Sequence, residues 1–166
     1  VQDVMSVFPL LQYHTIADIG CGPGHFTIPL GKYVFDGKVY AIDARQAMLD
    51  AVKLELERIH LTNVELVRSK GSKLPLENDS LDGAVTAFMA HKVRKPEVLL
   101  KEVMRCLRKG GWFVLLEWHK REMDEGPPLE KRIGEGQLRE IAQDVGFRFT
   151  RRHSVNDKQY LLLMRR

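Results

Sequence analysis

A glycine-rich loop between a β-prone run and an apolar helical segment constrains this chain more than any other feature. Residues 17–26 read Ala-Asp-Ile-Gly-Cys-Gly-Pro-Gly-His-Phe, with glycine at positions 20, 22 and 24. Glycine lets the backbone turn sharply and approach a ligand closely. A helix that begins after such a loop directs its free N–H groups and the positive end of its dipole at that ligand. The order of strand, glycine loop and helix therefore predicts an α/β fold that binds a nucleotide-like cofactor.

The spacing of the glycines separates two classes of cofactor site. A dinucleotide-binding loop has the pattern G-x-G-x-x-G, which from Gly20 would require a third glycine where the chain has His25. The chain instead has G-x-G-x-G, with Asp18 two residues before the first glycine. Asp43 ends the β-prone run 38–43, where a carboxylate can accept hydrogen bonds from both ribose hydroxyls of a cofactor. Asp43 thus fits any nucleoside cofactor, whereas His25 disfavours a nicotinamide oxidoreductase.

Strand-like and helical patterns alternate along the chain, which predicts a parallel sheet covered by helices on both faces. The predicted strands are residues 14–19, 39–42, 64–67, 81–88 and 112–118, and the predicted helices are 26–34, 45–60, 96–108 and 135–145. Two further strands, 147–153 and 159–164, are expected to form a closing antiparallel hairpin. In the helix 45–60 the predicted buried face consists of Met48, Val52, Leu56 and Ile59.

Length and composition limit the classes of protein that this chain can belong to. With 166 residues it is long enough for one domain and too short for two. No apolar run approaches the roughly 18 residues of a membrane-spanning helix. The two cysteines make neither a disulfide framework nor a metal site, so we expect a cytoplasmic protein. The net charge is +4 with a basic excess near the C-terminus, but these cations are not interleaved with aromatic residues, which disfavours a nucleic-acid interface.

Three segments together resemble the class I S-adenosylmethionine-dependent methyltransferases, in particular the quinone-biosynthesis group of methyltransferase domain type 11. Residues 17–26 are similar to motif I of that family, and residues 74–82 resemble the segment that leads into its fourth strand. Residues 99–111 resemble its following helix and turn, with Lys109 where proline is usual. The resemblance implies that residues 1–166 form one domain with a three-layer α/β/α Rossmann-like fold and a mostly parallel seven-stranded sheet. It also implies S-adenosyl-L-methionine as the cofactor, with S-adenosyl-L-homocysteine as the product.

The resemblance assigns roles to residues around the glycine loop. The implied cofactor-binding residues are Asp18, Gly20, Cys21, Gly22, Gly24, Asp43, Ala44, Met48, Lys70, Gly71 and Ser72. The glycines would face the methionine part of the cofactor, and Asp18 would reach its amino group. Asp43 would hold the ribose hydroxyls, while Ala44 and Met48 would line the adenine pocket.

Lys70 departs from the pattern of the family. The family commonly has an aspartate at this position, whose carboxylate accepts a hydrogen bond from the adenine amino group. An ammonium group donates hydrogen bonds and cannot accept one. Either Ser69, Ser72 or a backbone carbonyl replaces the contact, or adenine binding is weakened.

Methyl transfer from a sulfonium is an in-line displacement that requires mainly alignment, with a base where the acceptor loses a proton. Ligands of open α/β sheets lie beyond the carboxyl ends of the strands. The residues expected there are His25, Phe88, His91, Glu117 and His119. Among them His91, Glu117 and His119 are the candidate catalytic residues, and the reaction needs no metal.

The choice of acceptor follows from a missing motif. Residues 86–91 lack the Asn/Asp-Pro-Pro-Tyr/Phe segment of nucleobase amine methylases, which favours a small-molecule acceptor. A catalytically inactive cofactor-binding or regulatory domain and an RNA-modifying methyltransferase are the alternatives. The sequence leaves open whether the chain forms a homodimer and whether an element precedes Val1.

Overall fold

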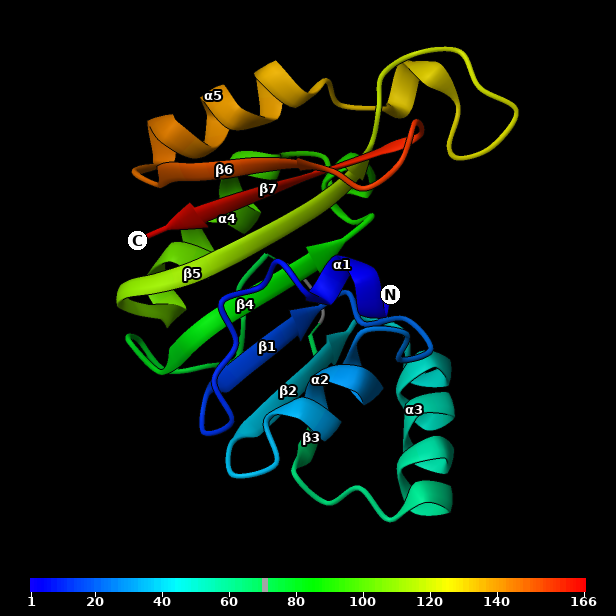
Figure 1. The fold of residues 1–166 in the computed structure, drawn as a ribbon, viewed down its shortest axis with the longest axis vertical. Helices are drawn as coiled ribbons and strands as arrows, with labels where there is room; N and C mark the ends of the chain where they lie inside the picture. Colours follow the sequence, from blue (N-terminus) through cyan, green and yellow to red (C-terminus); the bar gives the residue numbers. More distant parts are fainter. Residues whose placement is uncertain (70–71) are drawn as a thin grey trace.

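The computed structural model describes residues 1–69 and 72–166, and their strands form a seven-stranded sheet (Figure 1). The strands are β1 (Thr15–Ile19), β2 (Lys38–Asp43), β3 (Val64–Arg68), β4 (Leu81–Ala87), β5 (Leu107–Trp118), β6 (Arg148–Ser154) and β7 (Gln159–Arg165). The α-helices are α1 (Gln2–Met5), α2 (Thr27–Tyr33), α3 (Gln46–Ile59), α4 (Pro96–Cys106) and α5 (Glu135–Val145). Two short 3-10 helices are η1 (Ala90–Lys92) and η2 (Leu129–Lys131).

The sheet has the order β3-β2-β1-β4-β5-β7-β6. Strands β1 to β5 pair in parallel, whereas β7 runs antiparallel to both of its neighbours, β5 and β6. Helices α4 and α5 bury apolar side chains against one face of the sheet, and α1, α2 and α3 bury theirs against the other (Figure 1). The predicted three-layer α/β/α fold with its C-terminal antiparallel hairpin is therefore confirmed.

The strand order creates a crevice between β1 and β4. From β1 the chain adds β2 and then β3 on one side, and β4 then returns to the other side of β1. The connections that leave β1 and β4 therefore diverge, and this switch point is where open α/β sheets bind their ligands. The glycine loop leaves the carboxyl end of β1 at this point (Figure 1).

The boundary between α4 and β5 differs from the predicted one. Helix α4 ends at Cys106 rather than Arg108, and β5 begins at Leu107 rather than at Trp112. Leu107 has extended backbone, is fully buried and pairs with Leu81 of β4. Burial of this leucine in the sheet thus ends the helix two residues before its predicted end.

The buried face of α3 is also rotated from the predicted one. Leu49, Val52 and Leu56 are buried, whereas Met48 and Ile59 are partly exposed. The buried three pack in the cluster that contains Cys21 of the glycine loop and Ala41 of β2. Contact with the loop and with β2 therefore decides which side of the helix faces inward.

Candidate functional site

A cavity of about 1230 Å³ opens at the switch point of the sheet. Its walls are the glycine loop after β1, the tip of β2, the connection from β3 to β4, and the segment from the end of β4 into α4. Pockets for one small ligand commonly measure about 300–1000 Å³. This cavity therefore has room for a cofactor and a second molecule.

The glycine loop contributes backbone to the cavity wall. Gly20, Gly22 and Gly24 all have positive φ, at 75°, 53° and 95°. A Cβ at Gly20 would lie 2.2 Å from Cγ of Met89, whereas a Cβ at Gly22 would have nothing within 4 Å. Gly20 and Gly22 line the cavity, but Gly24 does not and instead faces Val52 of α3. Gly20 thus lets Met89 pack against the loop, Gly22 leaves open space for a ligand, and Gly24 allows close packing of α3.

Asp43 lies at the tip of β2 with both carboxylate oxygens engaged. Its Oδ2 accepts a hydrogen bond from the Gly22 N–H at 3.0 Å, and its Oδ1 accepts one from the Arg45 N–H at 2.9 Å. Nε of Arg45 lies 3.6 Å from the same Oδ1. Because a carboxylate oxygen has two lone pairs, each oxygen keeps acceptor capacity for a further donor such as a hydroxyl. Asp43 both braces the glycine loop and faces the cavity.

Asp18 is the second carboxylate on the wall, and it is almost completely buried. Its Oδ2 accepts a hydrogen bond of 2.6 Å from the hydroxyl of Thr27, the first residue of α2. Burial raises the pKa of Asp18 to about 6, although the Thr27 hydrogen bonds favour the ionised form. Near neutral pH this carboxylate is thus an acceptor whose charge responds to modest acidification.

Cys21, the second residue of the glycine loop, also lines the cavity. Burial raises the pKa of its thiol to about 12, and the charges of Asp18 and Asp43 act in the same direction. The thiol therefore stays protonated and is not a nucleophile at neutral pH.

Within residues 1–69 and 72–166 no group of three or more His, Cys, Asp or Glu side chains could hold a metal ion. In the same residues no helix is long and apolar enough to cross a membrane.

Some of the residues assigned to adenine line the cavity wall next to Asp43. Ala44, Ser69 and Ser72 line the cavity, but Met48 does not. The rotation of α3 described above places Leu49 rather than Met48 on its inward face. Lys70 and Gly71, which were also assigned to this wall, lie outside the described residues.

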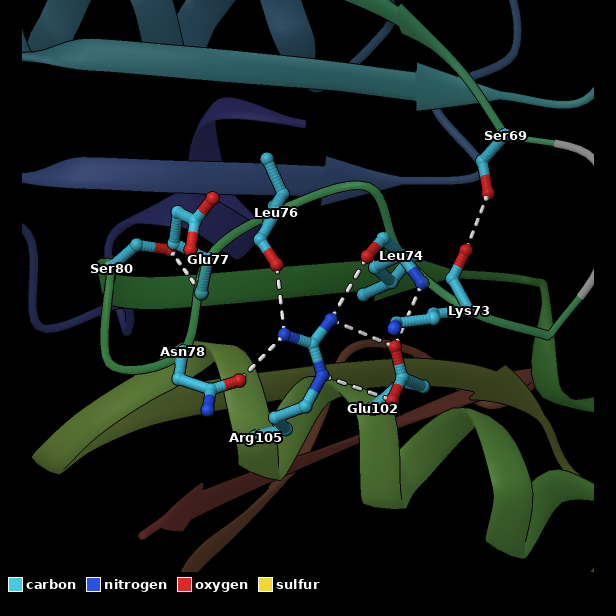
Figure 2. A network of polar contacts seen from close by, with 9 residues as sticks. All are labelled: Ser69, Lys73, Leu74, Leu76, Glu77, Asn78, Ser80, Glu102 and Arg105. Carbon is cyan, nitrogen blue, oxygen red and sulfur yellow. Dashed lines mark hydrogen bonds and ion pairs between the residues drawn. The ribbon is translucent and has the colours of Figure 1, made fainter.

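Helix α4 holds the connection from β3 to β4 through Arg105 (Figure 2). Both Nη atoms donate to the connection, to the carbonyls of Leu74 at 2.9 Å and Leu76 at 2.8 Å and to Oδ1 of Asn78 at 2.8 Å. Nε and one Nη also donate to the two carboxylate oxygens of Glu102, at 3.0 and 2.9 Å, and Glu102 accepts the N–H of Leu74 at 2.8 Å. Leu74 lines the cavity, so this network sets the position of one cavity wall.

His91 and Glu117 contact each other rather than the cavity. Nδ1 of His91 lies 2.8 Å from Oε2 of Glu117, and the His91 N–H donates to Oε1 at 3.2 Å. The two side chains are 6% and 1% exposed. His119 packs its ring against Tyr160, with centroids 5.3 Å apart, and burial lowers the pKa of its imidazole. All three are described residues, and none of them lines the cavity.

The segment between β4 and α4 contributes cavity residues that the sequence reasoning did not single out. Met89, Lys92, Arg94 and Lys95 line the cavity together with the aromatic ring of Phe88. Phe88 has a positive φ of 57°, which is uncommon for a bulky residue. One sequence feature could have indicated these cations. Lys92, Arg94 and Lys95 form a basic run between the end of a predicted strand and the first turn of a predicted helix, at the ligand-binding edge of the sheet.

Comparison with known proteins places the chain in a family. A profile of the family described as "Methyltransferase domain" matches residues 17–115. The chain belongs to this family. The methyltransferase domain is 35% identical over 117 residues to demethylmenaquinone methyltransferase of Bacillus mycoides strain KBAB4, a match that covers 70% of this chain and 49% of that protein. The protein of the same name from Staphylococcus haemolyticus strain JCSC1435 is 36% identical over 117 residues, covering 70% and 46%. The chain thus spans about half the length of the curated relatives it matches.

Solved structures agree with this assignment. A SAM-dependent methyltransferase from Aquifex aeolicus superposes with a TM-score of 0.93 at 30% identity, covering 99% of this chain and 88% of that one. The 4+2-cyclase SpnF superposes with a TM-score of 0.88 at 17% identity, covering 99% and 79%. The likeness to SpnF concerns the fold alone. The resemblance to class I S-adenosylmethionine-dependent methyltransferases is confirmed.

Proposed function

We propose that the methyltransferase domain binds S-adenosyl-L-methionine in the cavity and catalyses transfer of its methyl group to a small-molecule acceptor. The observation that carries the proposal is the Asp43 carboxylate at the tip of β2, which the N–H groups of Gly22 and Arg45 hold at the cavity wall. The family match and the likeness to the Aquifex aeolicus methyltransferase support this cofactor. We also propose that residues 1–166 form one domain.

The residues present on the wall fit this cofactor. The proposed contacts come from Asp18, Gly20, Cys21, Gly22, Asp43, Ala44, Ser69 and Ser72, all of which line the cavity. Open space beyond Gly22 admits a ligand against the loop backbone, and the free lone pairs of Asp43 suit two ribose hydroxyls. The hydroxyls of Ser69 and Ser72 offer acceptors on the adenine side.

When bound, the cofactor supplies a methyl group on a sulfonium sulfur, with a neutral thioether as the leaving group. The residues of this chain mainly have to position the reacting atoms, an effect worth up to about 7–11 kcal/mol. Asp18 and Asp43 place negative charge beside the glycine loop, where it favours a cationic ligand. Phe88 and Met89 add apolar atoms to the cavity wall, and Met89 lies against Gly20 of the loop.

The pair of His91 and Glu117 has a positioning role in this proposal. Glu117 accepts a hydrogen bond from the backbone N–H of His91, and its other carboxylate oxygen contacts Nδ1 of the His91 ring. These two contacts fix η1 to the end of β5. Helix η1 directly follows Phe88 and Met89 on the cavity wall. His119 lies outside the cavity and takes no direct part.

The ion pairs of three C-terminal cations support a small-molecule acceptor over RNA. Arg152 pairs with Glu135 at 2.7 Å and Lys158 with Glu125 at 2.9 Å, and Arg166 pairs with an aspartate of the loop before β4. Cations that already have carboxylate partners are less available for phosphates. The name of the curated relatives makes the uncharged quinone demethylmenaquinone one of the acceptors to assay.

A cofactor-binding domain without methyl transfer is the second candidate function. SpnF is named as a cyclase, although its fold closely matches that of this chain. The fold by itself therefore does not fix the reaction. Release of S-adenosylhomocysteine in the presence of an acceptor separates this candidate from the first.

Calorimetric titration with S-adenosylmethionine, S-adenosylhomocysteine and NAD tests the proposal. We expect the first two to bind and NAD to give no heat, and we expect Asp43→Ala to weaken binding by about 10–100-fold. Asp144→Ala, which removes an exposed carboxylate from the end of α5, is the matched control and should bind like the wild type.

A second variant guards against misfolding of Asp43→Ala, since Asp43 also braces the loop. Asparagine tolerates positive φ, and nothing lies within 4 Å of a Cβ at Gly22, so Gly22→Asn should fold and place its side chain in the cavity. Wild-type affinity in Gly22→Asn, or absence of binding in the wild-type protein, would refute the proposed site.

A further inference from the structure

Three cations lie next to one another on the wall of the cavity. Lys92 ends η1, Lys95 precedes the first residue of α4, and Arg94 lies between them; all three line the cavity and are exposed. Within residues 1–69 and 72–166 none of them forms an ion pair. Glu97, in the first turn of α4, is the acid next in sequence, and it neither pairs with them nor lines the cavity.

The charges of the described cavity wall are divided between its two sides. The carboxylates, Asp18 and Asp43, belong to the glycine loop side, where Arg45 partly balances Asp43. On the side that leads into α4, three charged side chains from the segment 88–99 line the cavity, and all three are positive. This side of the cavity therefore carries an uncompensated positive potential.

Helix α4 adds to that potential. It has eleven residues, and Lys95 at its N-cap position makes no side-chain hydrogen bond to the free N–H groups of the first turn. The positive end of the helix dipole thus lies at the same wall as the three cations. Glu97 offsets part of it, but the wall still has a net positive charge.

The remainder of this side is apolar. Its other cavity-lining residues are Phe88, Met89, Val93, Val98 and Leu99. Apolar surface beside an anion-attracting rim suits a molecule with an apolar body and one negatively charged group.

We propose that the acceptor of this methyltransferase domain is an amphipathic anion, whose carboxylate or phosphate is held by Lys92, Arg94 and Lys95 while its apolar part contacts Phe88 and Leu99. The inference rests on the proposed function, because it assigns the glycine loop side of the cavity to the cofactor. The cavity, at about 1230 Å³, exceeds the usual volume of a site for one ligand, about 300–1000 Å³, so the two molecules fit together.

Calorimetry with a matched pair of probes tests this inference. The protein is first titrated with S-adenosylhomocysteine and, once saturated, with 2-naphthoate or with 2-naphthamide, its neutral isostere. The variant Lys92→Gln/Arg94→Gln/Lys95→Gln removes the cationic wall. The control variant Lys101→Gln/Lys120→Gln/Lys131→Gln removes the same net charge from exposed lysines that do not line the cavity.

We expect 2-naphthoate to bind the wild-type protein about tenfold more tightly than 2-naphthamide, a preference that weakens as salt is added. The cavity variant should lose the preference and the control variant should keep it. In both variants the affinity for S-adenosylhomocysteine should stay within about twofold of the wild type, since exposed charges contribute little to a site they do not contact.

Other outcomes would overturn the inference in distinguishable ways. Equal binding of the two probes, or no binding of either, shows that the wall does not select anions, and equal losses in the two variants show an effect of net charge alone. Loss of S-adenosylhomocysteine affinity in the cavity variant with unchanged 2-naphthoate binding assigns the cations to the carboxylate of the cofactor. Absence of S-adenosylhomocysteine binding in the wild type refutes the proposed function itself.

Discussion

Replacement of Arg105 by methionine tests whether α4 holds the connection between β3 and β4 in place. All five N–H groups of the guanidinium donate hydrogen bonds, three of them to the connection and two to Glu102 (Figure 2). Methionine keeps the aliphatic stem and has a helix propensity close to that of arginine. The substitution therefore removes these hydrogen bonds and changes little else.

The expected loss of unfolding free energy is about 2–4 kcal/mol. The bonds to the Leu74 and Leu76 carbonyls contribute about 1 kcal/mol each, because both acceptors are only partly accessible to water. The two-bond contact with Glu102 adds about 1 kcal/mol, less than a fully buried pair, since the side chains of Arg105 and Glu102 are 24% and 18% exposed. The contact with Asn78 is exposed and adds little.

Urea unfolding followed by tryptophan fluorescence measures the loss, by linear extrapolation to water. The matched control is Arg58→Met, which removes an exposed guanidinium that pairs with Glu55 on α3 and should leave the midpoint unchanged. Arg105→Lys keeps the charge without the planar fork and should recover less than half of the loss. A loss in Arg105→Met no larger than in Arg58→Met, or wild-type stability in Arg105→Lys, would refute the reasoning.

Three further predictions concern two buried acids, Asp18 and Glu117. Because burial raises the pKa of Asp18 to about 6 and the ionised form is the better acceptor, affinity for S-adenosylhomocysteine should fall as the pH drops through about 6; an unchanged inflection in Asp18→Asn would contradict this. The folded protein also binds more protons than the unfolded chain between the ordinary aspartate pKa and about 6. Its stability should therefore fall as pH rises across that window, and Asp18→Asn should remove this dependence in urea unfolding. Glu117→Gln should leave a buried donor of His91 unpaired and cost about 1–3 kcal/mol in the same assay, whereas the exposed control Glu122→Gln should cost nothing measurable; equal stability of these two variants would count against a structural role for the pair.

The glycine loop side of the cavity was largely predictable because it depends on local features of the chain. Gly20 and Gly22 stand where the backbone needs positive φ and close approach, and Asp43 stands at the end of a short β-prone run. Each of these requirements is met within a few residues of sequence. The structure accordingly places all three residues on the cavity wall.

The features that sequence reasoning missed depend on contacts between distant segments. The periodicity of residues 96–108 is helical to its end, but Leu107 leaves the helix because it pairs with Leu81, which is 26 residues earlier. Met48 and Leu49 are adjacent on α3 and both are apolar. Contact with the glycine loop decides that Leu49 is the one that is buried. The local sequence pattern cannot choose between two helix ends or two buried faces, because their local free energies differ by less than one tertiary contact contributes.

The candidate catalytic residues show the same limit in the chemistry of the site. His91 follows β4, and Glu117 lies near the end of the neighbouring strand β5, at the ligand-binding edge of the sheet. Their proximity to the cavity could therefore be predicted, but the direction of their side chains could not. A buried glutamate and a buried imidazole are each costly without a partner, and contact with one another satisfies both. Among the described residues, the imidazole that does line the cavity is that of His25, which is exposed on the glycine loop. The side proposed for the acceptor thus offers cations and apolar surface, groups that bind and orient a molecule rather than remove its proton. An in-line methyl transfer requires this contribution most.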